Sequence, residues 1–242
     1  MLREAMARYG RDNLGFFWLI GEPLILSCGV LIIWTAIGGH GHAEVGMVPL
    51  MLSGYATLTL QRHIINRATH KLRNSTALLY HRKIHLLDGL ISTTLLESIS
   101  VLGAFLVAYA GLYLFDLVPA IRDPIALFGS WLLWVWYLFA SALIIASLTE
   151  LVEWVEHLIP PLMYFGIPIS GTFYISDWIP YDFRKILLLN PQVHVNELFR
   201  SAFFPPEVHL YGDPWYVFWW SAIMMAIGLF MVDYAKLAIR YD

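Results

Sequence analysis

A short polar stretch around residue 195 carries the side chains with the most chemical potential in this sequence. His194 and Glu197 are three residues apart, so a helix would place both side chains on one face. An imidazole beside a carboxyl group can serve as a general acid and base, and Glu97, inside an apolar segment, is a second candidate carboxyl group. One hypothesis is therefore an enzyme that performs acid–base chemistry.

Several catalytic and ligand-binding motifs are absent. The sequence has no G-x-x-x-x-G-K-[ST] loop for ATP phosphates, no G-x-S-x-G nucleophile motif and no H-E-x-x-H zinc motif. Two histidine pairs, at 40 and 42 and at 81 and 85, do not form a known metal-binding motif, and the single cysteine, Cys28, cannot form an intrachain disulfide. We expect this chain to bind no cofactor and no metal, so another protein would have to hydrolyse any ATP.

Two carboxyl groups lie well inside apolar segments, Glu22 and Glu97. Ionisable residues within membrane spans are typical of the ion or proton relays of secondary transporters, but two are few for a relay. Glu22 precedes Pro23, which favours a structural role at a helix kink. We likewise expect Glu97 to face another helix and to form a hydrogen bond there.

Composition identifies the bilayer as the solvent of this chain. Of its 242 residues, 59% are apolar and only 14% are charged, and the mean hydropathy is +0.63. The net charge is -3 and no long basic run occurs, which argues against a nucleic acid as a partner.

The predicted fold is an all-α integral membrane protein with six transmembrane helices in a single domain, 1–242. The segments proposed to cross a bilayer core of about 30 Å are 14–37, 47–61, 89–115, 125–148, 158–174 and 215–233. The second is short and the fifth is interrupted by prolines.

Positive charge predicts that both termini are cytoplasmic. Three of the 15 Lys and Arg residues precede the first span, six lie in 62–88 and two follow the last span. The remaining four fall on the opposite side if there are six spans.

Two cytoplasmic segments are predicted to be helices that do not cross the membrane. Residues 1–13 have apolar side chains at helical spacing, which indicates an interfacial amphipathic helix, with a frayed terminus as the alternative. Within 62–88, Asn74 is a candidate helix cap, and Leu78 to Tyr80 would then form an exposed apolar knob. Such a knob fits a groove on a partner protein or, alternatively, the lipid headgroups.

The segment 176–213 is too polar to cross the membrane and too apolar to be a free loop. It predicts two short outer helices, 181–189 and 191–204, of re-entrant or interfacial type. The second begins with Asn190 in the capping position and Pro191 in the first helical position.

Several strings together resemble type-2 ABC exporter permeases that move polysaccharides. They include Arg8-Tyr9-Gly10-Arg11, Glu22-Pro23, Ser170-Gly171 and Phe173-Tyr174. The most specific is Asn190-Pro191-x-Val193-His194-Val195-x-Glu197-Leu198-x-Arg200, which is most similar to the capsular polysaccharide permeases of Gram-negative bacteria. O-antigen and teichoic-acid exporters share these strings less closely.

The resemblance implies a homodimer in the bacterial inner membrane with two separate ABC ATPase subunits, which would bind ATP and magnesium. The substrate would be a lipid-linked polysaccharide, and periplasmic and outer-membrane export proteins would be further partners. By the same resemblance, the ATPase contacts would include Arg11, Asn74, Leu78, Leu79, Tyr80 and His81. A carboxylate-rich turn at 150–156 contains no Lys or Arg, so an arginine contact to the ATPase is not expected there.

The resemblance also assigns candidate channel and exit residues. Candidates for the channel or its lateral gate are Trp18, Trp131, Trp134, Tyr164, Phe173 and Tyr174. The helices at the periplasmic exit would include Asn190, Pro191, His194, Glu197 and Arg200. The alternatives are an exporter of O-antigen or another lipid-linked glycan, and a membrane enzyme that acts on lipid-linked sugars.

Overall fold

The computed structural model describes residues 25, 29, 46–79, 86–152 and 154–239. The predicted interfacial helix 1–13 and the predicted span 14–37, except at these two positions, lie outside the described residues. The candidate residues Arg11, Trp18, Tyr80 and His81 lie outside them as well.

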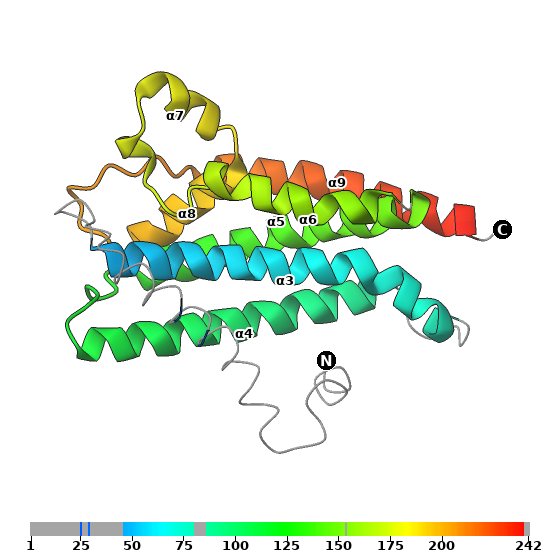
Figure 1. The fold of residues 1–242 in the computed structure, drawn as a ribbon, viewed down its shortest axis with the longest axis horizontal. Helices are drawn as coiled ribbons and strands as arrows, with labels where there is room; N and C mark the ends of the chain where they lie inside the picture. Colours follow the sequence, from blue (N-terminus) through cyan, green and yellow to red (C-terminus); the bar gives the residue numbers. More distant parts are fainter. Residues whose placement is uncertain (1–24, 26–28, 30–45, 80–85, 153, 240–242) are drawn as a thin grey trace, which may run out of the picture.

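The described part of the chain is helical and contains no strand. Its helices are α3 (Met47–Leu79), α4 (Leu86–Leu114), α5 (Pro124–Leu151), α6 (Val155–Gly166), α7 (Tyr181–Leu187), α8 (Pro191–Ser201) and α9 (Pro214–Ile239), with short 3₁₀ turns at Ile167–Ile169 and Ser176–Trp178. The long helices α3, α4, α5 and α9 lie side by side, and α4 runs in the opposite direction to α3 (Figure 1). Helices α7 and α8 lie at the end of the bundle where α3, α5 and α9 begin (Figure 1).

Three of these helices are long and apolar enough to cross a membrane: Leu87–Leu114, Pro124–Leu151 and Pro214–Ala235. They correspond to the predicted segments 89–115, 125–148 and 215–233. The fold class is therefore confirmed as all-helical with membrane-spanning candidates.

The predicted span 158–174 ends earlier than expected. Helix α6 has 12 residues and contains Pro160 and Pro161, and a 3₁₀ turn ends it. Gly171 then adopts a left-handed conformation, with φ of 72°, which a continuing helix does not permit. At 1.5 Å per residue, α6 covers roughly 18 Å, less than the bilayer core of about 30 Å.

Helix α3 is much longer than the predicted span 47–61. It continues without interruption for 33 residues, which include Asn74. The prediction that Asn74 caps a separate helix is therefore wrong. The physical reason is that no glycine or proline follows Gly54 before Leu79, so nothing interrupts the backbone hydrogen bonds.

Polar side chains cap the first turns of α5 and α8. The Asp123 carboxylate accepts hydrogen bonds from the backbone N–H groups of Ile125 and Ala126, at 2.9 and 3.0 Å, and begins α5. The Asn190 side chain accepts from the N–H of Gln192, at 3.0 Å, and begins α8. The second capping site confirms the predicted start of this helix.

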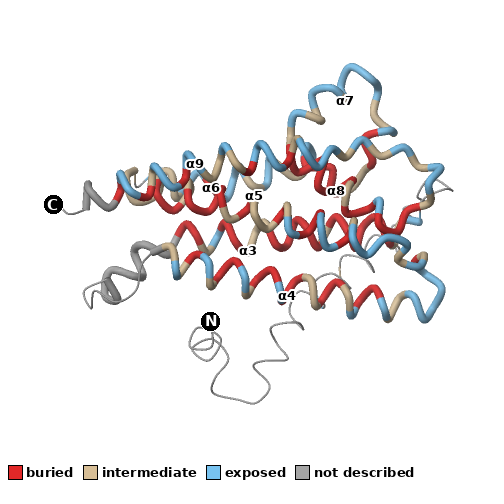
Figure 2. Tube along the Cα trace, turned by 180° about the vertical axis from the view of Figure 1, so that it is seen from behind, coloured by how far each residue is buried: buried red, intermediate tan, exposed pale blue. Residues whose placement is uncertain are grey.

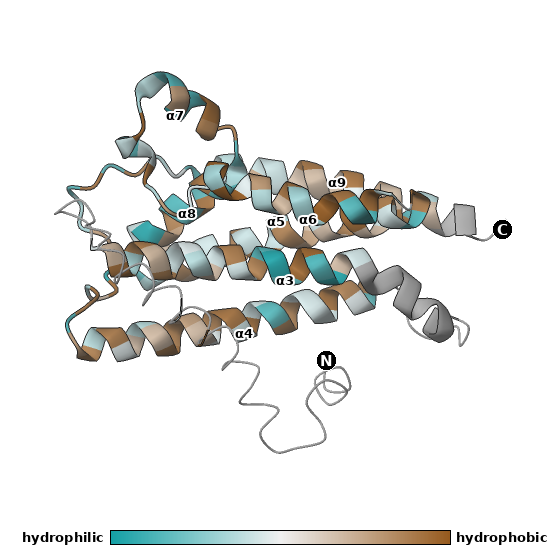
Figure 3. Ribbon diagram, in the orientation of Figure 1, coloured by the Kyte–Doolittle hydropathy of each residue, from teal (hydrophilic) through white to brown (hydrophobic). Residues whose placement is uncertain are grey.

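The core lies where α3, α5 and α8 meet. Figure 2 shows buried positions concentrated on these helices, whereas α7 is mostly exposed. Figure 3 shows that hydrophilic positions also occur on α3 and α8. Because polar groups inside an apolar bundle must be hydrogen-bonded, these positions locate the candidate site.

Candidate functional site

Three hydrogen-bonded side-chain pairs connect α3 to α8, and we refer to them as the polar ladder. The Arg200 Nε donates to Ser53 Oγ at 3.2 Å, the Thr57 hydroxyl donates to Asn196 Oδ1 at 2.5 Å, and the Gln192 amide donates to Gln61 Oε1 at 2.8 Å. Positions on each helix are four residues apart, or about one turn, so each set lies on one face. Their order on the two helices is opposite, as expected for antiparallel neighbours.

The top of the ladder, Arg200, is fully buried. Its guanidinium donates to the backbone carbonyls of Gly171 and Tyr174, both at 2.8 Å, and of Thr172 at 2.5 Å. Its partners in the described part of the chain are carbonyl oxygens and a hydroxyl, with no carboxylate among them. A buried charge is tolerated when its donors are all used, so Arg200 organises the 170–174 loop around itself.

Arg200 keeps its positive charge although it is buried. Loss of solvent lowers the pKa of the guanidinium to about 10, and the nearby Glu197 carboxylate opposes the decrease. The group therefore remains protonated at neutral pH and keeps its donors.

The 170–174 loop approaches the backbone of α3 very closely. A Cβ atom on Gly54 would overlap the carbonyl oxygen of Thr172 and approach the Arg200 guanidinium to 2.8 Å. Gly54 is therefore needed for this contact, because any larger residue would push the loop away. The left-handed Gly171 allows the same loop to turn.

Glu197 and His194 bind backbone groups instead of forming an acid–base pair. The Glu197 carboxylate accepts hydrogen bonds from the backbone N–H groups of Ser176, at 2.9 Å, and Tyr211. The His194 Nδ1 accepts from the N–H of Asp213 at 3.1 Å, which leaves the Nε2 proton to be donated to the Leu188 carbonyl at 2.7 Å.

Both side chains are also buried, at 1% and 6% exposure for Glu197 and His194. Their hydrogen-bonding atoms are therefore occupied in holding the segments on either side of α8. This arrangement does not provide the free acid and base that the enzyme hypothesis requires.

Glu97 lies on α4 and faces α3, as the sequence analysis favoured. Its carboxylate is 2.7 Å from Arg67 Nε and 2.9 Å from His63 Nδ1, and the residue is 4% exposed. This cluster joins α3 to α4 at a point further along α3 than the polar ladder. Among the described residues, no group of three His, Cys, Asp or Glu side chains is arranged to hold a metal ion.

Trp131 and Trp134, which are candidates for the channel or its lateral gate, are buried between the helices. The two residues are 2% and 0% exposed, respectively. Their indole N–H groups donate to Ser98 Oγ at 3.0 Å and to the Thr57 carbonyl at 3.1 Å. Because an indole can satisfy its one donor within a core, both rings join α5 to its neighbours and neither lines an open surface.

The other described gate candidates lie on α6 and in the 170–174 loop. Tyr164 on α6 is 60% exposed, and its hydroxyl accepts a hydrogen bond from Arg62 on α3 at 3.0 Å. The Arg62 guanidinium also lies 5.1 Å from the centre of the Tyr164 ring. Phe173 and Tyr174 are partly buried in the loop that Arg200 holds.

The predicted exit residues all cluster around α8. Asn190 begins the helix and also donates to the Ile169 carbonyl at 2.9 Å, and Pro191 is buried at the first helical position. The sequence analysis did not identify the three partners on α3, Ser53, Thr57 and Gln61. The available signal was their four-residue spacing within an apolar segment.

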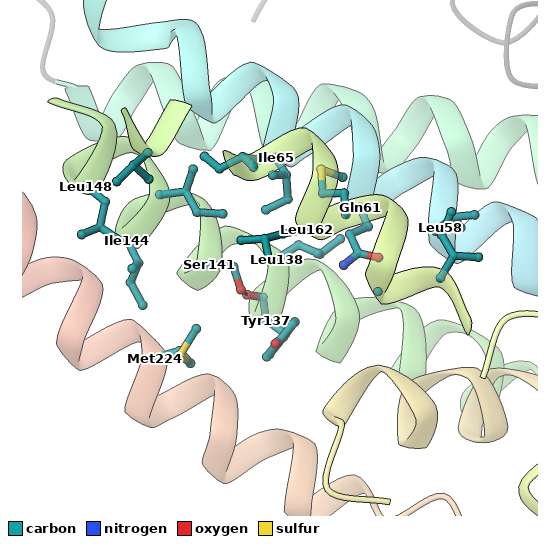
Figure 4. Close-up of a pocket in the computed structure, with 16 residues that line it drawn as sticks. Leu58, Gln61, Ile65, Tyr137, Leu138, Ser141, Ile144, Leu148, Leu162 and Met224 are labelled. Atoms are coloured by element: carbon teal, nitrogen blue, oxygen red, sulfur yellow. Dashed lines mark hydrogen bonds between the residues drawn. The ribbon is translucent and has the colours of Figure 1, made fainter. Parts of the chain in front are cut away.

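A cavity of about 360 Å³ lies near the ladder, between α3, α5, α6 and α9. Figure 4 shows the side chains that line it, which come from all four helices. Most of them are aliphatic, and Gln61, the last member of the ladder on α3, is at its edge.

Comparison with known proteins supports the predicted resemblance. No protein-family model matches the chain. It is 28% identical over 233 residues to the capsule polysaccharide export inner-membrane protein CtrC of Neisseria meningitidis, and 29% identical over 232 residues to BexB of Haemophilus influenzae, which has the same description. These alignments cover 96% of this chain and 88% of each relative.

The polysialic acid transport protein KpsM of Escherichia coli is 25% identical over 231 residues, which are 94% of this chain and 88% of that protein. The chain is thus a homologue of the capsule polysaccharide export inner-membrane proteins, in line with the predicted resemblance to polysaccharide-exporter permeases.

Proposed function

We propose that this chain is the channel-forming permease subunit of an ATP-driven exporter. It would move lipid-linked capsular polysaccharide across the inner membrane to the periplasm. The proposed assembly contains two copies of the chain and two ABC ATPase subunits, which bind and hydrolyse ATP with magnesium. Periplasmic and outer-membrane export proteins would receive the polymer.

The continuity of α3 is the observation that carries this proposal. One end of α3 contributes the polar ladder and meets the 170–174 loop, and the other end contains 74–79, where the ATPase contact is predicted. A helix of 33 residues is roughly 50 Å long, so a displacement of one end of α3 can be transmitted to the other end through a single helix. ATP-driven closure of the partner subunits would then displace α8 and the loop at the exit.

The arrangement of the ends supports the proposed topology. The end of α3, the start of α4 and the end of α9 lie together, opposite α7 and α8 (Figure 1). The basic segment 62–88 includes the second half of α3 and the start of α4, and Lys236 and Arg240 follow the predicted last span. By the positive-inside rule, this end is cytoplasmic and α7 and α8 are periplasmic.

Co-purification from the native host tests the assembly. A tagged chain is extracted into nanodiscs, its bound proteins are identified, and ATPase activity is measured. We expect a stoichiometric ABC ATPase subunit, which is lost when Leu79→Asp and Tyr80→Asp are combined. Leu114→Asp is the matched control, because Leu114 is 81% exposed and lies at the opposite end of the bundle.

The opposite result would also be clear. A chain that purifies alone, acts on a lipid-linked sugar and is indifferent to ATP would overturn the exporter proposal. It would instead favour the enzyme hypothesis.

A further inference from the structure

The cavity between α3, α5, α6 and α9 has the composition of a hydrocarbon site. Its walls include Leu58 and Ile65 of α3, Ile144 of α5, Leu162 of α6 and Met224 of α9. These side chains offer dispersion contacts and no charge. A volume of about 360 Å³ is within the range of about 300–1,000 Å³ that is usual for small-molecule sites.

Two of the polar residues in the wall already form hydrogen bonds within the protein. The Ser141 hydroxyl donates to the Tyr137 carbonyl at 2.9 Å. Gln61 already accepts a hydrogen bond from Gln192 at 2.8 Å. Because a water molecule needs two or more polar partners, while apolar cavities take apolar ligands, the largely aliphatic lining favours an apolar occupant.

The cavity is bordered by helices that are candidates to lie in the hydrocarbon core of the bilayer. Two of the four helices that form its walls, α5 and α9, are candidate membrane spans. Ile144 lies in α5 and Met224 in α9, and both residues are partly exposed. Leu162 of α6 is 63% exposed and also lines the cavity. A side chain that is both in the wall and on the outer surface indicates that the cavity opens to the outer surface beside α6.

We propose that this cavity binds one hydrocarbon chain of a membrane amphiphile, inserted from the bilayer behind α6. The chain could be an acyl chain of a phospholipid or the anchor of the exported glycan, because both present the same chemistry to these walls. This binding site does not depend on ATP. It rests on the membrane location and the cavity lining, so it stands or falls separately from the exporter proposal.

A glycine in the wall provides a direct test. Gly166 of α6 lines the cavity, and a Cβ atom there would meet no atom within 4 Å. Its backbone angles, φ of -68° and ψ of -25°, suit any residue. Gly166→Ala therefore adds a methyl group at the wall without a clash, and we expect Gly166→Leu to occupy more of the cavity. Gly129→Leu is the matched control, because Gly129 on α5 is exposed, meets no atom within 4 Å and lies outside the cavity.

The experiment uses the full chain in vesicles of phosphatidylethanolamine and phosphatidylglycerol. A small share of the phosphatidylglycerol carries a diazirine midway along one acyl chain, and labelled peptides are mapped by mass spectrometry after irradiation. We expect label on peptides that contain Met163 and Met224. Labelling should decrease in Gly166→Ala and be lost in Gly166→Leu, while Gly129→Leu retains it.

Labelling of these peptides that is the same in Gly166→Leu and in the wild type would overturn the proposal. The same holds if the lining residues cross-link to residues 14–37 of the chain itself and take no lipid label. If Gly166→Leu does not yield a folded protein, the decrease in Gly166→Ala decides the question.

Lipids retained by the purified chain then identify the source. A host that makes the glycan is compared with one in which its synthesis is blocked. Retention of an anchor from the first host alone assigns the cavity to the substrate, and retention of phospholipid from both assigns it to a bilayer lipid. Retention that Gly166→Leu does not reduce in either host would contradict the proposed site.

Discussion

The Thr57 hydroxyl on α3 donates a hydrogen bond to the Asn196 side chain on α8, 2.5 Å away, across 139 residues of sequence. The Thr57 carbonyl also accepts from Trp134 on α5, at 3.1 Å. One residue therefore joins three helices at the centre of the polar ladder. In the proposed exporter, this junction passes movement of α3 to the exit helix.

Replacement of Thr57 by valine tests the strength of this junction. Thr57→Val keeps the shape of the side chain and leaves the Asn196 oxygen without its donor. We expect a loss of about 1–3 kcal/mol of stability, seen as a lower thermal midpoint in detergent. Thr149→Val is the control, because the Thr149 hydroxyl bonds only to carbonyls of its own helix. Equal midpoints for the two variants would contradict a special role for Thr57.

Gly54 should tolerate no side chain. Gly54→Ala places a Cβ atom where the Thr172 carbonyl lies, so we expect a loss of about 1–3 kcal/mol or more, as for overpacked cores. Gly111→Ala is the control, since a Cβ atom there meets nothing within 4 Å. That variant should be neutral or gain up to about 1 kcal/mol from the helix propensity of alanine. Thermal midpoints measure both, and a harmless Gly54→Ala would disprove the close contact.

Arg200→Lys should fail to replace arginine in spite of its charge. The guanidinium reaches three loop carbonyls from a planar fork, whereas an ammonium is a single point on a flexible stem. We expect a loss of about 3–5 kcal/mol, which is typical of a broken buried charge network, and a reduced amount of folded protein in the membrane. Arg122→Lys, at an exposed position, should leave that amount unchanged. Full recovery of folded protein with Arg200→Lys would show that charge alone suffices.

Arg67 should be coupled to the buried carboxylate of Glu97 more strongly than an arginine is to an exposed carboxylate. A double-mutant cycle with Glu97→Gln and Arg67→Gln is expected to give about 1–3 kcal/mol. The comparison cycle uses Asp177 and Arg184, a pair at 3.3 Å whose carboxylate is exposed, for which about 0–1 kcal/mol is expected. A coupling between Glu97 and Arg67 that is no larger than that between Asp177 and Arg184 would remove Glu97 as the link between α3 and α4.

Much of the fold follows from local features of the sequence. The spans at 89–115 and 125–148 are predictable because length and apolarity alone define them, and the start of α8 follows from Asn190 and Pro191. The length of α3 was missed because its second half is polar, and a hydropathy pattern ends a span where the helix itself continues. Absence of glycine and proline was the better guide to that helix.

The candidate site was harder to predict, because it depends on contacts between distant segments. Ser53, Thr57 and Gln61 are polar residues in an apolar segment, but their partners lie more than 130 residues away. For Trp131 and Trp134 the sequence leaves both a pore position and a core position open, because a tryptophan in a span suits either. Only the position of Ser98 and Thr57 opposite their N–H groups distinguishes the two.

The most direct test of the exporter proposal is the location and length of the polymer in the native host after this chain is deleted. Capsular polysaccharide is measured on the cell surface and inside the cell, with and without the wild-type chain. The proposal predicts full-length, lipid-linked polymer that accumulates inside the deleted strain and returns to the surface on complementation. Polymer that is absent or chemically altered, or surface polymer that persists without this chain, would contradict it.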